Sequence, residues 1–232
     1  EMLPSKWQTA GTTGYDFLAQ VNNLLTYQKA ENELTDFYEE LTGNYQPFQE
    51  QLWEKKAFIL YNHMRGELEN LYQELARLSD KKMLAPVYPE ELKEAIGEFL
   101  VHLPVYRLYI DRLPLGSEEA AAIENILSNT NKNGKATAAA VSILKKVFFE
   151  MPTAGNPDFN EKLLNFFRRC MQYSGPLMAK GLEDTLMYTC NRFIAHNEVG
   201  DSPSAFGISK EEFHRAMIER RQTWPLTMNT TS

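Results

Sequence analysis

A lysine and a glutamate three residues apart are the pair in this sequence whose types could hold a polar ligand. Lys180 and Glu183 lie in the run Met178–Thr185, shortly after Gly175 and Pro176. On a helical turn they would share one face, whereas a loop rising into a helix would present both to a cleft. Because lysine only donates hydrogen bonds and glutamate only accepts them, the pair suits sugar hydroxyls, which do both. The plainer interpretation is an exposed ion pair worth a few tenths of a kcal/mol.

Tyr15 and Asp16 form a second candidate pair, at the start of an expected helix. The apolar residues that follow keep helical spacing: Phe17, Val21, Leu24 and Leu25. Asp16 can therefore cap this helix, and Tyr15 can act in a hydrophobic staple. The functional alternative is an aromatic ring and a carboxylate that face a sugar site.

Composition and charge exclude several classes of protein. Hydrophobic residues make up 43% of the chain and charged residues 24%, which is typical of a globular protein. The net charge of −7 argues against a nucleic-acid partner, and the absence of a run of 18 apolar residues argues against a membrane span. Two cysteines, Cys170 and Cys190, are expected as buried free thiols in a reducing cytoplasm. The four histidines show no metal-ligand spacing, so we expect neither a metal nor a cofactor.

Apolar periodicity predicts a mainly helical protein. The longest expected helix runs from about 47 to 79, where an a/d pattern begins at Ala57 and a charged face, which includes Lys55 and Lys56, points to solvent. Residues 104–110 are the best strand-like or extended stretch, and 129–134 reads as a surface loop. The other expected helices span about 30–42 (with Leu34, Phe37, Tyr38 and Leu41 on one face), 89–102, 117–129, 137–149, 156–171 and 210–221.

Local signals mark several helix ends. Gly43 is a C-cap signal, Asn156-Pro157 an N-terminal signal, and Ser209 with Glu212 a capping box. Residues 1–14 read as turns because of Pro4, Gly11 and Gly14, and 224–228 as an extended segment. Periodicity assigns 186–194 to neither strand nor helix. The chain begins with Glu1 rather than Met, so we expect a piece of a longer protein.

Several motifs together resemble a known family. Trp7 with Ala10–Phe17 resembles the W-x-x-A-G-T-T-G-Y-D-F signature of the maltooligosyl trehalose synthases. Pro104–Arg107 is similar to that family's P-V-Y-R, and Gly175–Thr185 to its G-P-V-M-A-K-G-V-E-D-T. Asn197–Gly200, Phe213-His214 and Trp224-Pro225 fall in the family's order as well.

The resemblance implies a place in a larger fold. The family belongs to the α-amylase superfamily, which has a (β/α)8 catalytic barrel with inserted domains. We therefore expect an all-α, bundle-like insertion domain with short non-helical flanks from the barrel. The expected division is 1–15 as the first flank, 16–171 as the helical insertion and 172–232 as a barrel segment with the substrate-site motif.

The resemblance also implies a reaction. The family converts the reducing-end α-1,4 bond of a maltodextrin to an α,α-1,1 bond, and its three catalytic acids match no residue of this chain. We expect no catalytic residue here; Lys180 and Glu183 would hold the glucose that turns over, with Tyr15 and Asp16 as weaker candidates. The expected partners are a maltooligosaccharide and the rest of the parent barrel. The alternative is a stand-alone helical module that binds carbohydrate or protein.

Overall fold

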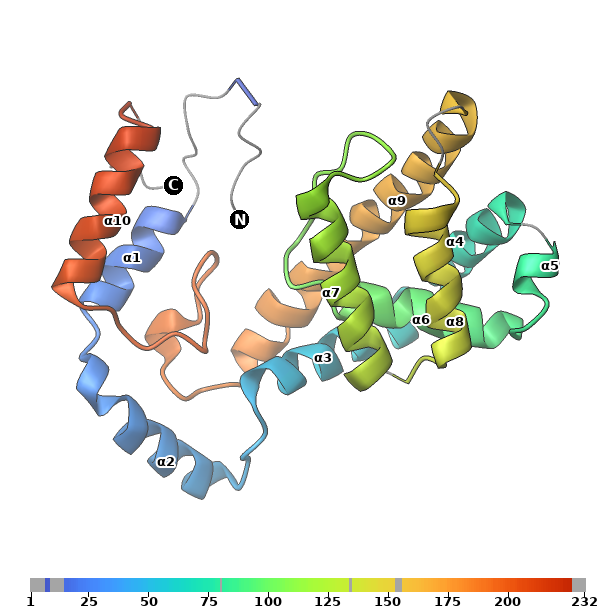
Figure 1. The fold of residues 1–232 in the computed structure, drawn as a ribbon. Helices are drawn as coiled ribbons and strands as arrows, with labels where there is room; N and C mark the ends of the chain where they lie inside the picture. The colour runs from blue at the N-terminus through green and yellow to red at the C-terminus, as the bar shows by residue number, and fades with distance from the viewer. Residues whose placement is uncertain (1–6, 9–14, 80, 134, 153–155, 227–232) are drawn as a thin grey trace. The chain divides into compact units, whose positions relative to one another are not determined.

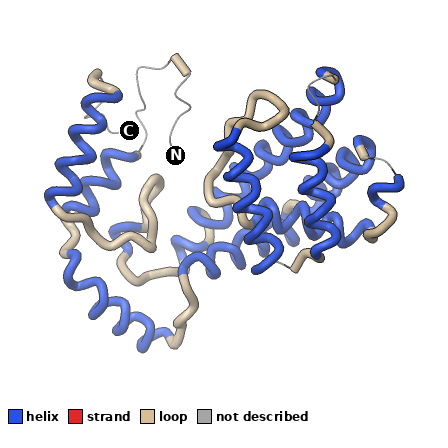
Figure 2. The backbone as a smooth tube through the Cα atoms, in the orientation of Figure 1, coloured by secondary structure: helices blue, strands red, loops and turns tan. Residues whose placement is uncertain are grey.

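The structure is a computed structural model of the 232-residue chain, and it describes all residues except 1–6, 9–14, 80, 134, 153–155 and 227–232. In this described part every regular element is a helix, and no strand occurs (Figures 1 and 2). The predicted all-α class is therefore confirmed. Contacts divide the chain into two compact units, one made mainly of Trp53–Gly181 and the other of Met2–Leu52 with Leu182–Ser232.

Helix α6, Pro89–Val101, is the centre of the first unit's core. It packs against four helices: α4 (Arg65–Leu78), α7 (Ser117–Asn133), α8 (Ala138–Lys145) and α9 (Pro157–Met178). Residues 95–101 of α6 are all buried, as expected for a helix that other elements surround. The Phe148 ring joins the core by contacts with Phe99 at 5.3 Å and Phe167 at 5.9 Å between centroids. The four inward-facing residues predicted for α6 are all buried: Leu92, Ile96, Phe99 and Leu100.

The long helix predicted for 47–79 is two helices, α3 (Phe48–His63) and α4 (Arg65–Leu78). Met64 interrupts them with a non-helical φ of −121°. At the break the Arg65 guanidinium donates to the Tyr61 carbonyl, which an uninterrupted helix would offer to the Arg65 backbone N–H. The prediction of a solvated Lys56 is also wrong, since this side chain is among the most buried in the protein.

Two other expectations in the first unit are wrong. Helix α7 continues to Asn133, so the predicted loop at 129–134 is helical as far as 133. Residues 104–110 contain bends and irregular backbone rather than a strand. A strand needs a hydrogen-bonded neighbour, and this segment instead lies along α9: the Leu108 N–H points to Met171 Sδ at 3.2 Å.

Helix α9 begins where the sequence predicts. The Asn156 side chain accepts from the Phe159 N–H at 3.1 Å, and Pro157 is the first helical residue. The predicted buried side is confirmed, with Leu163, Leu164, Phe166, Phe167 and Cys170 all inside. The helix runs on without a break through Pro176 to Met178, and a π-helical turn, η3 (Ala179–Glu183), continues it.

The second unit holds two further long helices and several short ones. Its elements are α1 (Asp16–Leu24), η1 (Gln28–Ala30), α2 (Glu31–Thr42), η4 (Leu186–Tyr188), η5 (Ile194–His196) and α10 (Lys210–Thr223). Gly43 ends α2 in the left-handed region at φ 65°, as predicted. The capping box of Ser209 and Glu212 at the start of α10 is confirmed as well.

The expected apolar face of α2 is largely exposed. Phe37 is 60% and Leu41 71% exposed, and no residue of this helix is buried. Leu34 and Tyr38 of the same face are half-buried. Amphipathic spacing predicts a face, but it does not predict how much of that face is covered.

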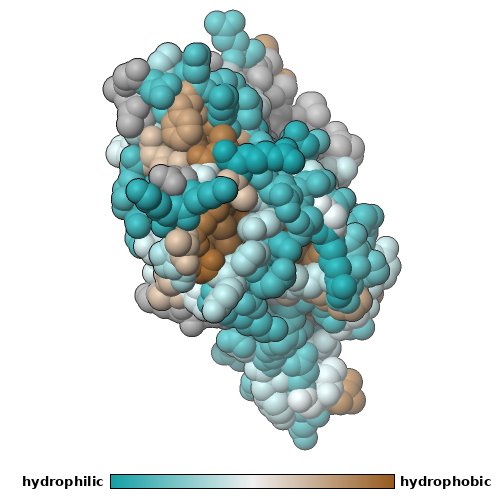
Figure 3. All heavy atoms as spheres, turned by 90° about the vertical axis from the view of Figure 1, so that its right-hand side faces the viewer, coloured by the Kyte–Doolittle hydropathy of each residue, from teal (hydrophilic) through white to brown (hydrophobic). Residues whose placement is uncertain are grey.

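Other expectations have mixed outcomes. Cys170 and Cys190 are buried free cysteines, as predicted. The turn expected at 1–14 falls mostly outside the described residues, as does the end of the extended segment at 224–228. The expected domain boundaries near residues 15 and 171 refer to the parent barrel and stay predictions. The surface drawn in Figure 3 is mainly hydrophilic, with small hydrophobic patches among polar residues.

Candidate functional site

The π-helical turn η3 carries the first candidate pair, Lys180 and Glu183. It is the end of a helix and not a loop that rises into one. Lys180 is exposed and Glu183 half-buried. The turn is also where the chain passes from the first unit to the second, after Gly181. π-Helical turns are uncommon and often occur at functional sites, so this local structure adds weight to the candidate.

The Pro104–Arg107 segment lies along the C-terminal part of α9, shortly before Lys180. The Ser174 hydroxyl donates to the Tyr106 carbonyl at 2.6 Å. A Cβ built on Gly175 would lie 3.3 Å from Arg107 Nε, so the guanidinium passes directly over this glycine. Two segments that the resemblance singled out separately are therefore packed against each other in the first unit.

Lys56 of α3 lies close to the candidate turn, and sequence reasoning missed it. It is 1% exposed, and its Nζ donates to the Leu103 carbonyl at 2.8 Å. Burial lowers the pKa of its ammonium group to about 7. A Cβ built on Gly181 would lie 2.6 Å from Lys56 Cγ. The missed signal is a spacing of four, because Leu52, Lys56 and Leu60 are all buried on one side of α3.

His102 is a second buried titratable residue near Lys56. His102 Nδ1 lies 2.8 Å from the Glu98 carbonyl, and the ring of Trp53 lies 4.5 Å from the His102 ring. His102 Nε2 has no hydrogen-bond partner among the described residues. Burial lowers the pKa of His102 and the nearby Lys56 lowers it further, while burial raises the pKa of Glu98. These shifts favour neutral forms, so the interior resists holding charge.

The second candidate pair lies at the start of α1 in the other unit. Tyr15 occupies the N-cap position and is 41% exposed, with its Cβ against Gly200. Asp16 is the first helical residue and not the cap, and the cap residue Tyr15 makes no side-chain capping hydrogen bond. It lies 3.7 Å from the Arg220 guanidinium of α10 instead. The prediction of an Asp16 cap is therefore wrong, because the cap position is one residue earlier.

A buried polar network lies behind Tyr15 in the second unit. Asp201 Oδ2 lies 2.7 Å from His196 Nδ1, and His196 Nε2 lies 3.1 Å from Thr26 Oγ1. The order Thr-His-Asp resembles a nucleophilic triad, but the Thr26 hydroxyl donates to the Asn22 carbonyl and is buried. The network therefore holds α1 against the 196–208 loop and offers no nucleophile.

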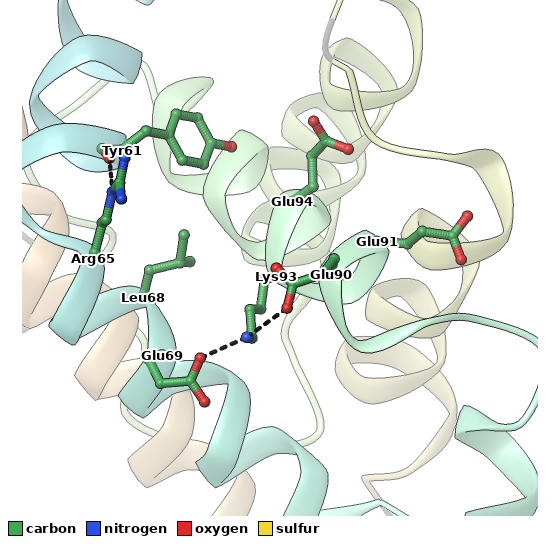
Figure 4. Close-up of a pocket in the computed structure, with 8 residues that line it drawn as sticks. All are labelled: Tyr61, Arg65, Leu68, Glu69, Glu90, Glu91, Lys93 and Glu94. Carbon is green, nitrogen blue, oxygen red and sulfur yellow. Dashed lines mark hydrogen bonds and ion pairs between the residues drawn. The ribbon is translucent and has the colours of Figure 1, made fainter.

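A pocket of about 520 Å³ lies among α3, α4 and α6, and Figure 4 shows the side chains that line it. Lys93 pairs with Glu69 at 2.7 Å and Glu90 at 2.9 Å. The side chain of Glu91 accepts from the Tyr88 N–H at 2.7 Å and so caps α6. None of the four expected site residues lines this pocket. Throughout the described part of the chain, no group of three metal-binding side chains gathers.

Comparisons with known proteins point to one family. No family model matches the chain. A curated protein of Mycobacterium tuberculosis, provisionally named maltooligosyl trehalose synthase, is 26% identical over all 232 residues. The solved maltooligosyltrehalose synthase of Arthrobacter ramosus is 27% identical and superposes on 97% of the chain with a TM-score of 0.74. The chain matches a segment of the maltooligosyl trehalose synthases.

The match extends to other synthases and across both units. A structure from Sulfolobus tokodaii, described as a hypothetical maltooligosyl trehalose synthase, is 28% identical over 95% of the chain, with a TM-score of 0.65. The chain spans only 27% of the curated relative from M. tuberculosis and 26% of the synthase from A. ramosus. The alternative of a stand-alone module is not favoured, because the matches to the synthases cover almost the whole chain.

None of the described helices is long and apolar enough to cross a membrane.

Proposed function

We propose that this chain forms part of a maltooligosyl trehalose synthase, which rearranges the reducing-end α-1,4 bond of a maltodextrin to an α,α-1,1 bond. The similarity of sequence and fold over nearly the whole chain is the observation that carries this proposal. The chain would supply part of the substrate cleft, and the rest of the parent barrel would supply the catalytic acids. A cytoplasmic location is part of the same proposal and rests on two free, buried cysteines.

Such a reaction sets a definite requirement for the cleft. In a retaining scheme the enzyme holds one part of the sugar covalently, and a second molecule attacks that intermediate. Here the attacking molecule is the glucose that has just been released, so it must stay bound while it turns over. Water that reaches the intermediate first would release the shortened maltodextrin from the enzyme, and the glucose would remain as the second hydrolysis product. The cleft must therefore hold glucose by its hydroxyl groups and exclude water.

Lys180 and Glu183 are the residues we assign to this task. Lys180 is exposed on the π-helical turn that ends α9, and its ammonium group can donate up to three hydrogen bonds. Glu183 follows on the same π-helical turn and can accept hydrogen bonds from hydroxyl groups. By resemblance, Tyr15 and Asp16 are weaker candidates; Asp16 lies 3.7 Å from the Arg220 guanidinium.

The test is the Lys180→Ala variant of the full-length synthase that contains this chain. We expect it to lose rearranged product and to release more free glucose, because the glucose would leave or be replaced by water before it turns. Both products are measured side by side from maltohexaose. Lys82→Ala on the four-residue helix α5 is the control, since its side chain is exposed and far along the chain from η3. An unchanged product ratio for Lys180→Ala would leave the residue as a surface cation only.

A further inference from the structure

Lys56 is a lysine where folding alone would favour an apolar residue. Its side chain is 1% exposed, and burial brings the pKa of its ammonium group to about 7. An amine taken out of water loses hydration, and one hydrogen bond to a neutral carbonyl offsets this only in part. A methionine of similar length would fill the same space without that penalty. The presence of a lysine at this position must therefore be explained by the contacts of its ammonium group and of its aliphatic part, the stem.

The ammonium group of Lys56 holds the start of the Pro104–Arg107 segment. Its Nζ donates to the carbonyl of Leu103, the residue just before Pro104. Leu103 is itself buried, so its carbonyl would lack this partner if Lys56 were replaced by an apolar residue. From there the segment runs onto α9, where the Ser174 hydroxyl donates to Tyr106.

The stem and backbone of Lys56 fix the position of the η3 turn. A Cβ built on Gly181 would lie 2.6 Å from Lys56 Cγ and 3.2 Å from both Cα and N of Lys56. The last two atoms are backbone and cannot move aside as a flexible side-chain end would. Helix α3 and η3 therefore touch at a point that only a glycine fits, and Gly181 is bonded directly to Lys180.

We propose that Lys56 is a positioning residue for Lys180. It joins three parts of the first unit: α3, the Leu103–Arg107 segment and the η3 turn. Through these contacts it fixes where the Lys180 backbone lies, and it does not touch the sugar itself. This inference rests on the proposed function of Lys180.

The experiment uses the full-length synthase with Lys56→Met, which keeps most of the stem and removes the ammonium group. The measurement is the fraction of turnovers that end as free glucose instead of rearranged product. We expect this fraction to rise by about tenfold, because a misplacement of about 1 Å at a holding group can cost up to about a hundredfold. Lys55→Met, the neighbouring lysine on the same helix, is the matched control and is expected to keep the wild-type fraction.

This fraction separates positioning from stability. A variant that is only less stable lowers the amount of folded enzyme, and both products then fall together. If Lys56→Met does not fold, Gly181→Ala tests the other contact, that of η3 with the stem and backbone of Lys56, and is expected to raise the glucose fraction in the same direction. A wild-type fraction in whichever of these variants folds would overturn the inference.

The Lys180→Ala variant, assayed in parallel, distinguishes the two proposals. If it raises the glucose fraction while Lys56→Met and Gly181→Ala leave it unchanged, the proposed function stands and the positioning role is wrong. If Lys180→Ala itself leaves the fraction unchanged, the proposed function of Lys180 fails, and the positioning role fails with it.

Discussion

Lys56 should make the stability of the chain depend on pH in a range where few groups titrate. Its pKa is about 7 in the folded chain and 10.5 for an ordinary lysine. Between these values the unfolded chain binds a proton that the folded chain does not, so the free energy of unfolding rises with pH. The slope is at most about 1.4 kcal/mol per pH unit. Below pH 7 both the folded and the unfolded chain bind the proton. The destabilisation of the folded chain by the buried ammonium group is then fully present and does not change with pH.

The measurement is urea unfolding of the wild type and Lys56→Met at pH 7, 8 and 9. The wild type should gain stability relative to the variant across this range. Cys170 acts in the opposite direction, because burial raises the pKa of its thiol and the unfolded chain loses that proton first. The comparison with the variant cancels this effect, since both proteins contain Cys170. Parallel pH profiles for the two proteins would contradict the shifted pKa of Lys56.

The sequence predicts the role of a residue where its type is usual for that environment. It does not predict a residue whose type is unusual for its environment, such as a buried lysine. Lys180 and Glu183 stand out because two opposite hydrogen-bonding groups lie three residues apart. Lysine is almost never fully buried, so the sequence predicts an exposed Lys56. Leu52 and Leu60, four residues before and after it, are buried and lie on the same side of α3. The contact of Asp201 with Asn23 is likewise not predictable from local sequence, because the two residues are 178 positions apart.

Individual helices differ in how much of their apolar surface the structure covers. Leu71, near the middle of α4, is fully buried in the core, whereas Leu41 of α2 is 71% exposed. We expect Leu71→Ala to lower the free energy of unfolding by about 2–5 kcal/mol, because it removes buried contacts and leaves a cavity. Leu41→Ala should change it by about 0.5 kcal/mol or less, as is usual at exposed sites. Chemical denaturation of both variants checks this, and equal losses would mean that α2 is covered.

Helix ends are predictable where a local hydrogen bond determines them. The caps at Asn156 and Ser209 and the left-handed Gly43 all depend on residues within four positions, and all three are confirmed. At the break at Met64, the Arg65 side chain donates to the Tyr61 carbonyl. The continuation of α7 to Asn133 crosses polar residues that have weak helix propensity. Neither the break at Met64 nor the continuation of α7 changes the spacing of apolar residues, so periodicity does not predict them.

The division of the chain into two units cannot be read from local patterns. The second unit combines Met2–Leu52 with Leu182–Ser232, and its polar contacts join residues far apart in sequence. The Gly207 N–H donates to the Asn23 side chain at 3.0 Å, and the Ile208 N–H donates to the Asn23 carbonyl at 3.1 Å. Periodicity describes each helix on its own, so it predicts neither these pairings nor the place where one unit gives way to the other.

The isolated 232-residue chain is expected to give no turnover of maltohexaose. Retaining chemistry at a glycosidic bond needs a carboxylate nucleophile and a second carboxyl group as acid and base. By resemblance, the family's catalytic acids match none of these residues, whereas Lys180 and Glu183 are the residues that we propose to hold the sugar. Weak maltodextrin binding should therefore persist without reaction, and NMR shifts at these two residues on titration with maltose would report it. Product formation by the isolated chain would contradict this division of labour, because it would require catalytic acids among the residues that this chain contains.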